Sequence, residues 1–166
     1  MIPVGLGLDS ARGAGLLVDT NLLVLFIIGT VSLDRIETFK RTRKYIKSDY
    51  NLLVRVLAKF DPLYAVAHVL AEVSNLTDLT GSERRQARLV LKEAISLLNE
   101  AEMSSERAAE DRLYQDLGLV DAAIGAVARS HKCTVLTDDF DLYVRLSHDN
   151  VNVLNFAHLQ ASAWGI

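Results

Sequence analysis

The first clear signal in this chain is an apolar run that three polar residues interrupt. Residues 16–18 are apolar, Asp19, Thr20 and Asn21 are polar, and residues 22–28 are apolar again. A short, uninterrupted apolar run is typical of a strand that is buried on both faces. The pattern predicts a strand over residues 16–19 and a helix through about Gly29. Asp19 would then lie where the strand ends.

Apolar spacing and breaker residues predict the remaining elements. Ser32 and Ser48 are good helix caps, and Asp61-Pro62 interrupts the helical pattern before a short apolar run. The predicted helices run from Ser32 through the basic residues up to 47, over 48–60, 67–79, 83–103, 105–118 and 121–130, and after residue 154. The further strands are predicted over 63–66, 133–137 and 151–154.

The predicted strands are separated by helices, and the turn density of an all-β protein is missing. This order is typical of an α/β fold with three layers, α/β/α, in which helices cover both faces of a parallel sheet. The length of 166 residues suits one domain. Residues 1–15 contain four glycines without a helical or strand period, so we expect a flexible tail over 1–15 and a single domain over 16–166.

Composition narrows the class of protein. The formal charge of −3 argues against a protein that coats nucleic acid nonspecifically. Cys133 is the only cysteine, so no internal disulfide can form and a reducing compartment is favoured. The longest apolar run, residues 22–28, is far shorter than the roughly 20 residues that cross a bilayer. We therefore expect a cytoplasmic protein without a membrane segment.

Four carboxylates lie beside buried-looking apolar runs: Asp19, Glu72, Asp121 and Asp139. Right-handed crossovers bring the carboxyl ends of all parallel strands to one edge of the sheet, where such folds collect ligands. Two carboxylates about 4 Å apart repel by roughly 4 kcal/mol at an effective dielectric near 20. A cluster of four would need bound cations or protons, and an oxygen-only donor set suits Mg²⁺ or Mn²⁺.

Each of these acids also has an ordinary structural interpretation. Asp19 and Asp121 are good helix caps by sequence, and Glu72 would lie at the rim of the apolar face of its helix. Asp138, Asp139 and Asp141 could be turn and cap residues. It is the recurrence of acids at one predicted edge that favours a metal site.

Basic residues gather in two places. Six lie between residues 35 and 47, among them Lys40, Arg41 and Lys44, and four more lie at near-helical spacing over 84–92. Such clusters are either solvated helix faces or a track for the phosphate backbone of a nucleic acid.

Four motifs in this order resemble the PIN domain, a metal-dependent ribonuclease fold. They are LLVDTNLL at 16–23, HVLAEVSNL at 68–76, LVDAAIGAVA at 119–128 and VLTDDFDLY at 135–143. The motifs also resemble the VapC-type toxins of bacterial toxin–antitoxin pairs. The resemblance implies a parallel sheet of four or five strands and a nuclease that hydrolyses RNA with Mg²⁺ or Mn²⁺.

The resemblance also implies roles for individual residues. Asp19, Glu72, Asp121 and Asp139 would be the catalytic metal ligands, with Asp138 and Asp141 as close substitutes for the fourth. Asn21 and Thr137 would support them by hydrogen bonding. Independently of the resemblance, the first basic cluster makes Lys40, Arg41 and Lys44 candidates for RNA binding.

The expected partners are an RNA substrate, a second copy of the chain in a homodimer and, for a toxin, a cognate antitoxin. The segment of about 40 residues between the first two strands is longer than in compact toxin members. Two rival functions stay open. A phosphatase with Asp19 as nucleophile would need an acid where Asn21 stands. A catalytically silent module would use the same fold to bind RNA or a partner protein.

Overall fold

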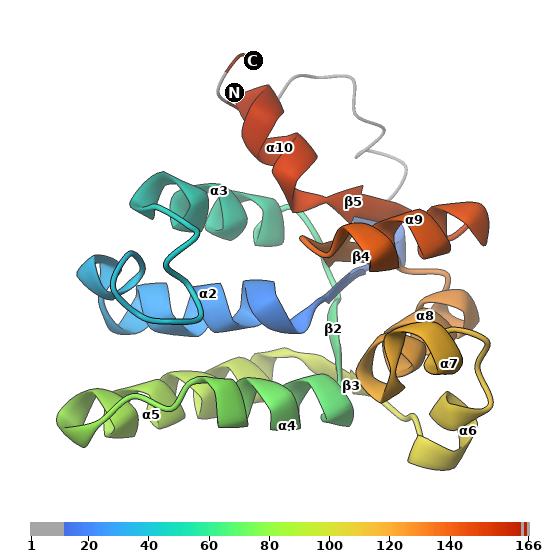
Figure 1. The fold of residues 1–166 in the computed structure, drawn as a ribbon, viewed down its shortest axis with the longest axis horizontal. Coiled ribbons are helices and arrows are strands. Elements are labelled where there is room, and N and C mark those ends of the chain that lie inside the picture. Colours follow the sequence, from blue (N-terminus) through green and yellow to red (C-terminus); the bar gives the residue numbers. More distant parts are fainter. Residues whose placement is uncertain (1–11, 164, 166) are drawn as a thin grey trace.

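A five-stranded parallel sheet runs through the centre of the molecule (Figure 1). The structure is a computed structural model, and it describes residues 12–163 and residue 165. The strands lie in the order β3-β2-β1-β4-β5, and every neighbouring pair is parallel. Their bounds are Leu16–Val18 (β1), Leu63–Val66 (β2), Asn99–Ala101 (β3), Thr134–Thr137 (β4) and Val153–Asn155 (β5). The expected α/β fold is confirmed, with five strands in its sheet.

Strand β1 is the central strand, and its composition fits this position. Leu16, Leu17 and Val18 are almost fully buried, as a strand covered on both faces requires. Leu16 lies opposite Leu63 of β2 on one side and Thr134 of β4 on the other. The residue that follows β1 therefore emerges in the middle of the carboxyl edge of the sheet.

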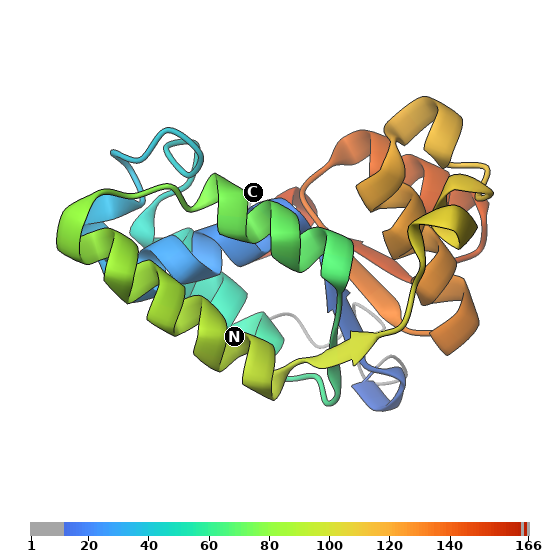
Figure 2. The same ribbon diagram turned by 90° about the horizontal axis from the view of Figure 1, so that it is seen from below.

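Helices cover both faces of the sheet, as Figure 2 shows. On one side lie α2 (Thr20–Val31), α3 (Lys47–Leu57), α4 (Ala67–Leu76) and α5 (Gly81–Leu97), and on the other α6 (Ser105–Ala109), α7 (Tyr114–Leu117), α8 (Leu119–His131) and α9 (Phe140–His148). Helix α10 (Phe156–Ala163) follows β5 and contacts α3. The chain steps from β1 to β3 in one direction and from β3 to β5 in the other, so right-handed crossovers place the two sets of helices on opposite faces. No helix in residues 12–163 is long and apolar enough to cross a membrane.

The start of the chain bears on the expected tail. Residues 1–11 lie outside the described residues, so a flexible tail stays a prediction for them. Arg12–Ala14 form a 3-10 helix (η1), and Gly15 is buried with a φ of 82°. The Gly15 carbonyl accepts a hydrogen bond from the Thr134 amide at 3.0 Å, and an added Cβ would meet the Pro62 carbonyl oxygen at 2.7 Å. Gly15 thus continues the pairing of β1 and β4.

The helix predicted from Ser32 through the basic residues is wrong. Only a short 3-10 helix forms there (η2, Leu33–Arg35), and the Ser32 side chain does not cap it. The chain then continues in turns up to α3. The buried Thr42 hydroxyl donates to the Ile36 carbonyl at 2.7 Å, a local bond that competes with helical hydrogen bonding.

The helix predicted over residues 83–103 is too long. Helix α5 ends at Leu97, Leu98 is extended, and the next residues form the edge strand β3. Asn99 of β3 lies opposite Tyr64 of β2. Asn99 and Glu100 are exposed, because a strand at the edge of the sheet faces water. This strand therefore has no apolar pattern that could distinguish it from the end of a helix.

The other predicted elements are present, with shifted ends. The segment 105–118 is divided into α6 and α7, and Ser104 caps α6 by accepting a hydrogen bond from the Arg107 amide at 3.2 Å. Helix α8 begins at Leu119, ahead of Asp121. That earlier start decides how Asp121 is placed.

Candidate active site

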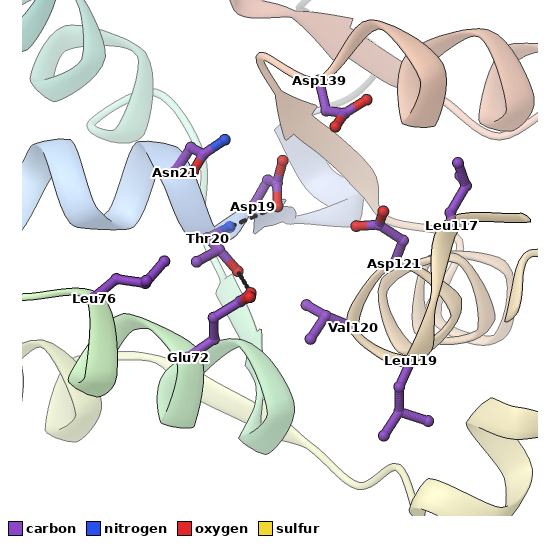
Figure 3. Close-up of a pocket in the computed structure, with 10 residues that line it drawn as sticks. All are labelled: Asp19, Thr20, Asn21, Glu72, Leu76, Leu117, Leu119, Val120, Asp121 and Asp139. Atoms are coloured by element: carbon purple, nitrogen blue, oxygen red, sulfur yellow. Dashed lines mark hydrogen bonds between the residues drawn. The ribbon is translucent and has the colours of Figure 1, made fainter. Parts of the chain in front are cut away.

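An acidic pocket of about 370 Å³ lies at the carboxyl edge of the sheet (Figure 3). Its acidic side chains are Asp19, Glu72, Asp121 and Asp139. The other residues that line it are Thr20, Asn21, Leu76, Leu117, Leu119 and Val120. The four carboxylates singled out in the sequence thus come together from four distant parts of the chain.

Asp19 lies directly after β1 and is 5% exposed. Its Oδ1 accepts a hydrogen bond from the Thr20 amide at 2.6 Å, so it does cap α2. Its Oδ2 accepts another from the Thr137 hydroxyl, also at 2.6 Å. Asp19 therefore combines the capping interpretation with a place in the pocket, and both carboxylate oxygens are fixed.

Glu72 reaches the pocket from α4, which begins directly after β2. It is half-buried, as its predicted place at the rim of the apolar face requires. Its Oε2 accepts a hydrogen bond from the Thr20 hydroxyl at 2.8 Å. Thr20 is the first residue of α2, so this bond ties the start of α2 to α4 beside Asp19 (Figure 3).

Asp121 lies in the first turn of α8, and its interpretation as a helix cap is wrong. Gly118 occupies the cap position, and no side chain caps this helix. In the part of the chain that the structure describes, no group donates a hydrogen bond to the Asp121 carboxylate. The carboxylate is half-buried and points toward Asp19 (Figure 3). No local bond therefore accounts for an acid at this position.

Asp139 caps α9 and is the fourth acid of the pocket. Its Oδ1 accepts a hydrogen bond from the Leu142 amide at 3.0 Å. Its own amide donates to the Thr137 hydroxyl at 2.9 Å. The buried Thr137 hydroxyl thus contacts both Asp19 and Asp139, and its supporting role stays a prediction.

Asp138 and Asp141, the two expected substitutes, do not line the pocket. Asp141 is exposed in the first turn of α9. The Asp138 side chain is 7% exposed and accepts hydrogen bonds from Asn21 at 3.2 Å, from Lys44 and from Tyr45. Burial and the charge of Asp138 raise the pKa of Tyr45 well above its ordinary value, so the phenol stays a donor.

Two of the pocket carboxyl groups, those of Asp19 and Asp121, have raised pKa values. Burial raises the pKa of Asp19 from 3.8 to about 6, against the opposing effect of its bonds from Thr137 and Thr20. Burial, followed by the charges of Asp19, Asp139 and Glu72, raises the pKa of Asp121 to about 7. Near neutral pH the pocket therefore holds protons that a cation could replace.

The donor set fits a hard divalent cation. Among the described residues, no three His, Cys, Asp or Glu side chains are close enough to hold one metal ion directly as they stand. Mg²⁺ keeps several of its waters and is usually bound directly by only one or two carboxylates, so a wide acidic pocket suits a hydrated ion. The half-buried Asp121 carboxylate, whose pKa is raised first by burial and then by three other acids, is the clearest sign of such a need.

Most of the first basic cluster is paired with acids. Lys40 contacts Asp78 at 2.9 Å, and Lys44 contacts Asp138 at the edge of the pocket. Arg35 pairs with Glu83 and Lys47 with Asp34, each at 2.5 Å. Arg41 and Arg43 are exposed, and neither has an ion pair within the described residues. Most of this cluster therefore lies in turns between η2 and α3 rather than on a solvated helix face, and Lys44 brings this basic turn segment to the edge of the site.

Sequence reasoning did not single out several residues of the site. Thr20 stands in the sequence only as one of three polar residues after the first strand, although it donates to Glu72. Leu117, Leu119 and Val120 form an apolar wall, and no spacing rule links them to the acids. The bonds from Lys44 and Tyr45 to Asp138 join residues that are far apart in the chain, so no local pattern could reveal them.

Comparison with known proteins agrees with this arrangement. No curated protein matches the chain. The family model of the PIN domain matches residues 16–147, a range that holds β1, β2, β3, β4 and all four pocket carboxylates. With four fifths of the chain in that match, this protein belongs to the PIN domain family.

Proposed function

We propose that this protein is a ribonuclease that hydrolyses RNA phosphodiester bonds with Mg²⁺ or Mn²⁺. PIN domains are typically nucleases. The observation that carries the proposal is the convergence of Asp19, Glu72, Asp121 and Asp139 on one pocket, where Asp121 has a raised pKa and no hydrogen-bond donor in the described chain.

The residues of the pocket would have two roles, metal binding and the positioning of the metal ligands. Asp19, Glu72, Asp121 and Asp139 would hold the cation. When bound, the cation supplies positive charge that offsets the carboxylates and the phosphodiester and makes a water a better nucleophile. Hydrogen bonds from Thr20 and Thr137 hold Glu72 and Asp19 in place before substrate arrives. Fixed groups of this kind need no reorganisation during the reaction.

Within this class we propose a VapC-type toxin that acts as a homodimer and is inhibited by a cognate antitoxin. The motif order described above supports this finer assignment. A small neighbouring reading frame that encodes a DNA-binding protein, and co-purification of the two products, would support it further. An isolated gene would favour RNA processing instead.

The proposal predicts cleavage that depends on both the metal and the acids. Purified protein should cleave a labelled single-stranded RNA in Mn²⁺ or Mg²⁺ and lose this activity in EDTA. Asp121→Asn should lower the cleavage rate by at least about a hundredfold, the scale expected when one key electrostatic group is removed. The rates are measured on gels under single-turnover conditions.

Asp141→Asn is the matched control, because it removes an exposed carboxylate on α9 outside the pocket. It should cleave at the rate of the unaltered protein. Undiminished cleavage in chelator, or equal rates for the two variants, would contradict the proposed function. A protein that binds RNA without cleaving it would support the silent module.

A further inference from the structure

A row of aromatic rings begins directly beside the acidic pocket. Phe140 is the first residue of α9 and follows Asp139, a pocket residue. Its ring lies 6.4 Å from that of Tyr143, measured between centroids, and the Tyr143 ring lies 5.3 Å from the His158 ring. Tyr143 belongs to α9 and His158 to α10, so the row crosses from one helix to the other.

The exposure of Phe140 is the unusual part of this row. Phe140 is 64% exposed, while α9 buries Leu142 and Leu146 against the fold. Packing therefore does not account for a phenyl ring at this position. Asp139 and Phe140 are neighbours in sequence, so their Cα atoms are only about 3.8 Å apart. A polymer whose phosphate enters the pocket at Asp139 therefore has this exposed ring within reach of its neighbouring bases.

We propose that Phe140, with Tyr143 and His158 behind it, is a stacking platform for the bases of a single-stranded nucleic acid whose backbone enters the acidic pocket. The inference rests on the proposed nuclease function and names its substrate as an unpaired strand. Exposed aromatic rings bind bases of any sequence, because every base has a flat π-face, whereas bases in a duplex are already stacked.

The surroundings of the row suit a nucleic acid better than an apolar protein partner. The platform continues from a pocket of carboxylates that would hold a cation for phosphate. Lys44, bonded to Asp138 just before Asp139, keeps a side chain that is 56% exposed at the same edge. Tyr143 and His158 also carry polar groups, as a surface for alternating bases and phosphates requires.

The test measures binding separately from cleavage. Fluorescence anisotropy gives the Kd of a labelled 12-nucleotide oligouridylate, of an abasic ribose-phosphate chain of equal length and of a 12-base-pair RNA duplex. All proteins carry Asp121→Asn, so that Mn²⁺ can be present. Phe140→Ala should weaken oligouridylate binding by about fivefold or more, and Phe140→Trp should preserve it, because stacking on one aromatic ring contributes at least about that factor. The abasic chain and the duplex should bind Phe140→Ala and the parent equally.

Two control variants test whether the effect belongs to the aromatic ring of Phe140. Leu89→Ala removes another exposed apolar side chain, 61% exposed on α5, and should leave binding unchanged. Phe140→Leu keeps an apolar side chain without a ring and should behave like Phe140→Ala. Equal oligouridylate binding by Phe140→Ala and the parent would overturn the platform. An equal loss for the abasic chain would overturn it too, as would a change confined to self-association, which indicates a protein contact.

Parallel assays on the protein without Asp121→Asn separate this inference from the proposed function. If the protein cleaves RNA in Mn²⁺ but its RNA binding does not depend on Phe140, the proposed function is supported and the stacking platform is rejected. If RNA binding depends on Phe140 but no cleavage occurs, the stacking platform is supported and the nuclease function is rejected. A protein that neither binds nor cleaves RNA would reject both.

Discussion

Thr137 is the residue on which two of the pocket carboxylates depend. Its buried hydroxyl donates to Asp19 at 2.6 Å and accepts from the Asp139 amide at 2.9 Å. One small side chain therefore fixes the first acid and the position of the loop that presents the fourth. The bond to Asp19 also lowers the pKa of that carboxyl group against the effect of burial.

Thr137→Val should damage the site and the fold together. Valine has nearly the same shape but leaves the buried Asp19 Oδ2 and the Asp139 amide without their partner. The loss should lower the free energy of unfolding by about 1 to 3 kcal/mol and reduce the rate of RNA cleavage sharply. Thr137→Ser keeps the hydroxyl and should therefore keep both stability and cleavage. Urea denaturation and single-turnover cleavage measure the two effects.

Thr134→Val provides an internal control in the same strand. The Thr134 hydroxyl is buried and has no hydrogen-bond partner among the residues that the structure describes. Its replacement by a methyl group should therefore be neutral or stabilising, and activity should be kept. Equal destabilisation by the two variants would show that the Thr137 contacts do not support the site.

At the scale of elements, apolar patterning predicts the buried strands well and the edge poorly. β1 and β4 are fully buried and could be found from their apolar runs. β3 could not, because two of its three residues are exposed and its place is fixed by pairing with β2. The turns between η2 and α3 were missed because hydrogen bonds such as that of Thr42 decide them.

The acids of the site could be predicted because topology brings strand ends together. Asp19 and Asp139 follow β1 and β4, and Glu72 lies on the helix that follows β2. Their partners could not be predicted in the same way. The contact of Tyr45 with Asp138, for example, depends on how the long segment after α2 folds back on the sheet.

The basic turn segment gives a prediction at this scale. Replacing Lys40, Arg41 and Lys44 with Ala should weaken RNA binding and reduce the slope of log K against log salt by up to about 2, since each contact with single-stranded phosphate contributes about 0.7. Replacing Arg85, Arg88 and Lys92 removes the same charge from an exposed face of α5. An equal loss in both triple variants would indicate general charge attraction rather than an RNA path along this segment.

For the whole molecule, the pocket makes stability depend on pH. The pKa values of Asp19 and Asp121 are raised from 3.8 to about 6 and about 7. Between pH 3.8 and 7 the native state therefore binds more protons than the unfolded state. The contribution of these two groups to the free energy of unfolding therefore falls as the pH rises through this window, as long as no cation replaces the protons.

Asp121→Asn should remove part of this penalty. In EDTA at pH 7.5 the variant should be more stable than the unaltered protein by about 1 to 4 kcal/mol, and at pH 4 the difference should nearly vanish. Thermal melts at pH 4, 6 and 7.5 measure the trend, with the exposed Asp141→Asn as the control. A difference that does not change with pH would show that the pocket does not destabilise the protein electrostatically.

Of the five described strands, the central strand β1 is made well before its neighbour β4. β1 comprises residues 16–18, whereas β4, which pairs with its other side, comprises residues 134–137. Even after β2 has paired with one side of β1, the growing chain must therefore carry the other side of this apolar strand unpaired until β4 is made, a state that invites aggregation or proteolysis. Asp139 also emerges after β4. The pocket of four carboxylates is thus complete only after residues 134–139 have been made, and products truncated before them should lack it.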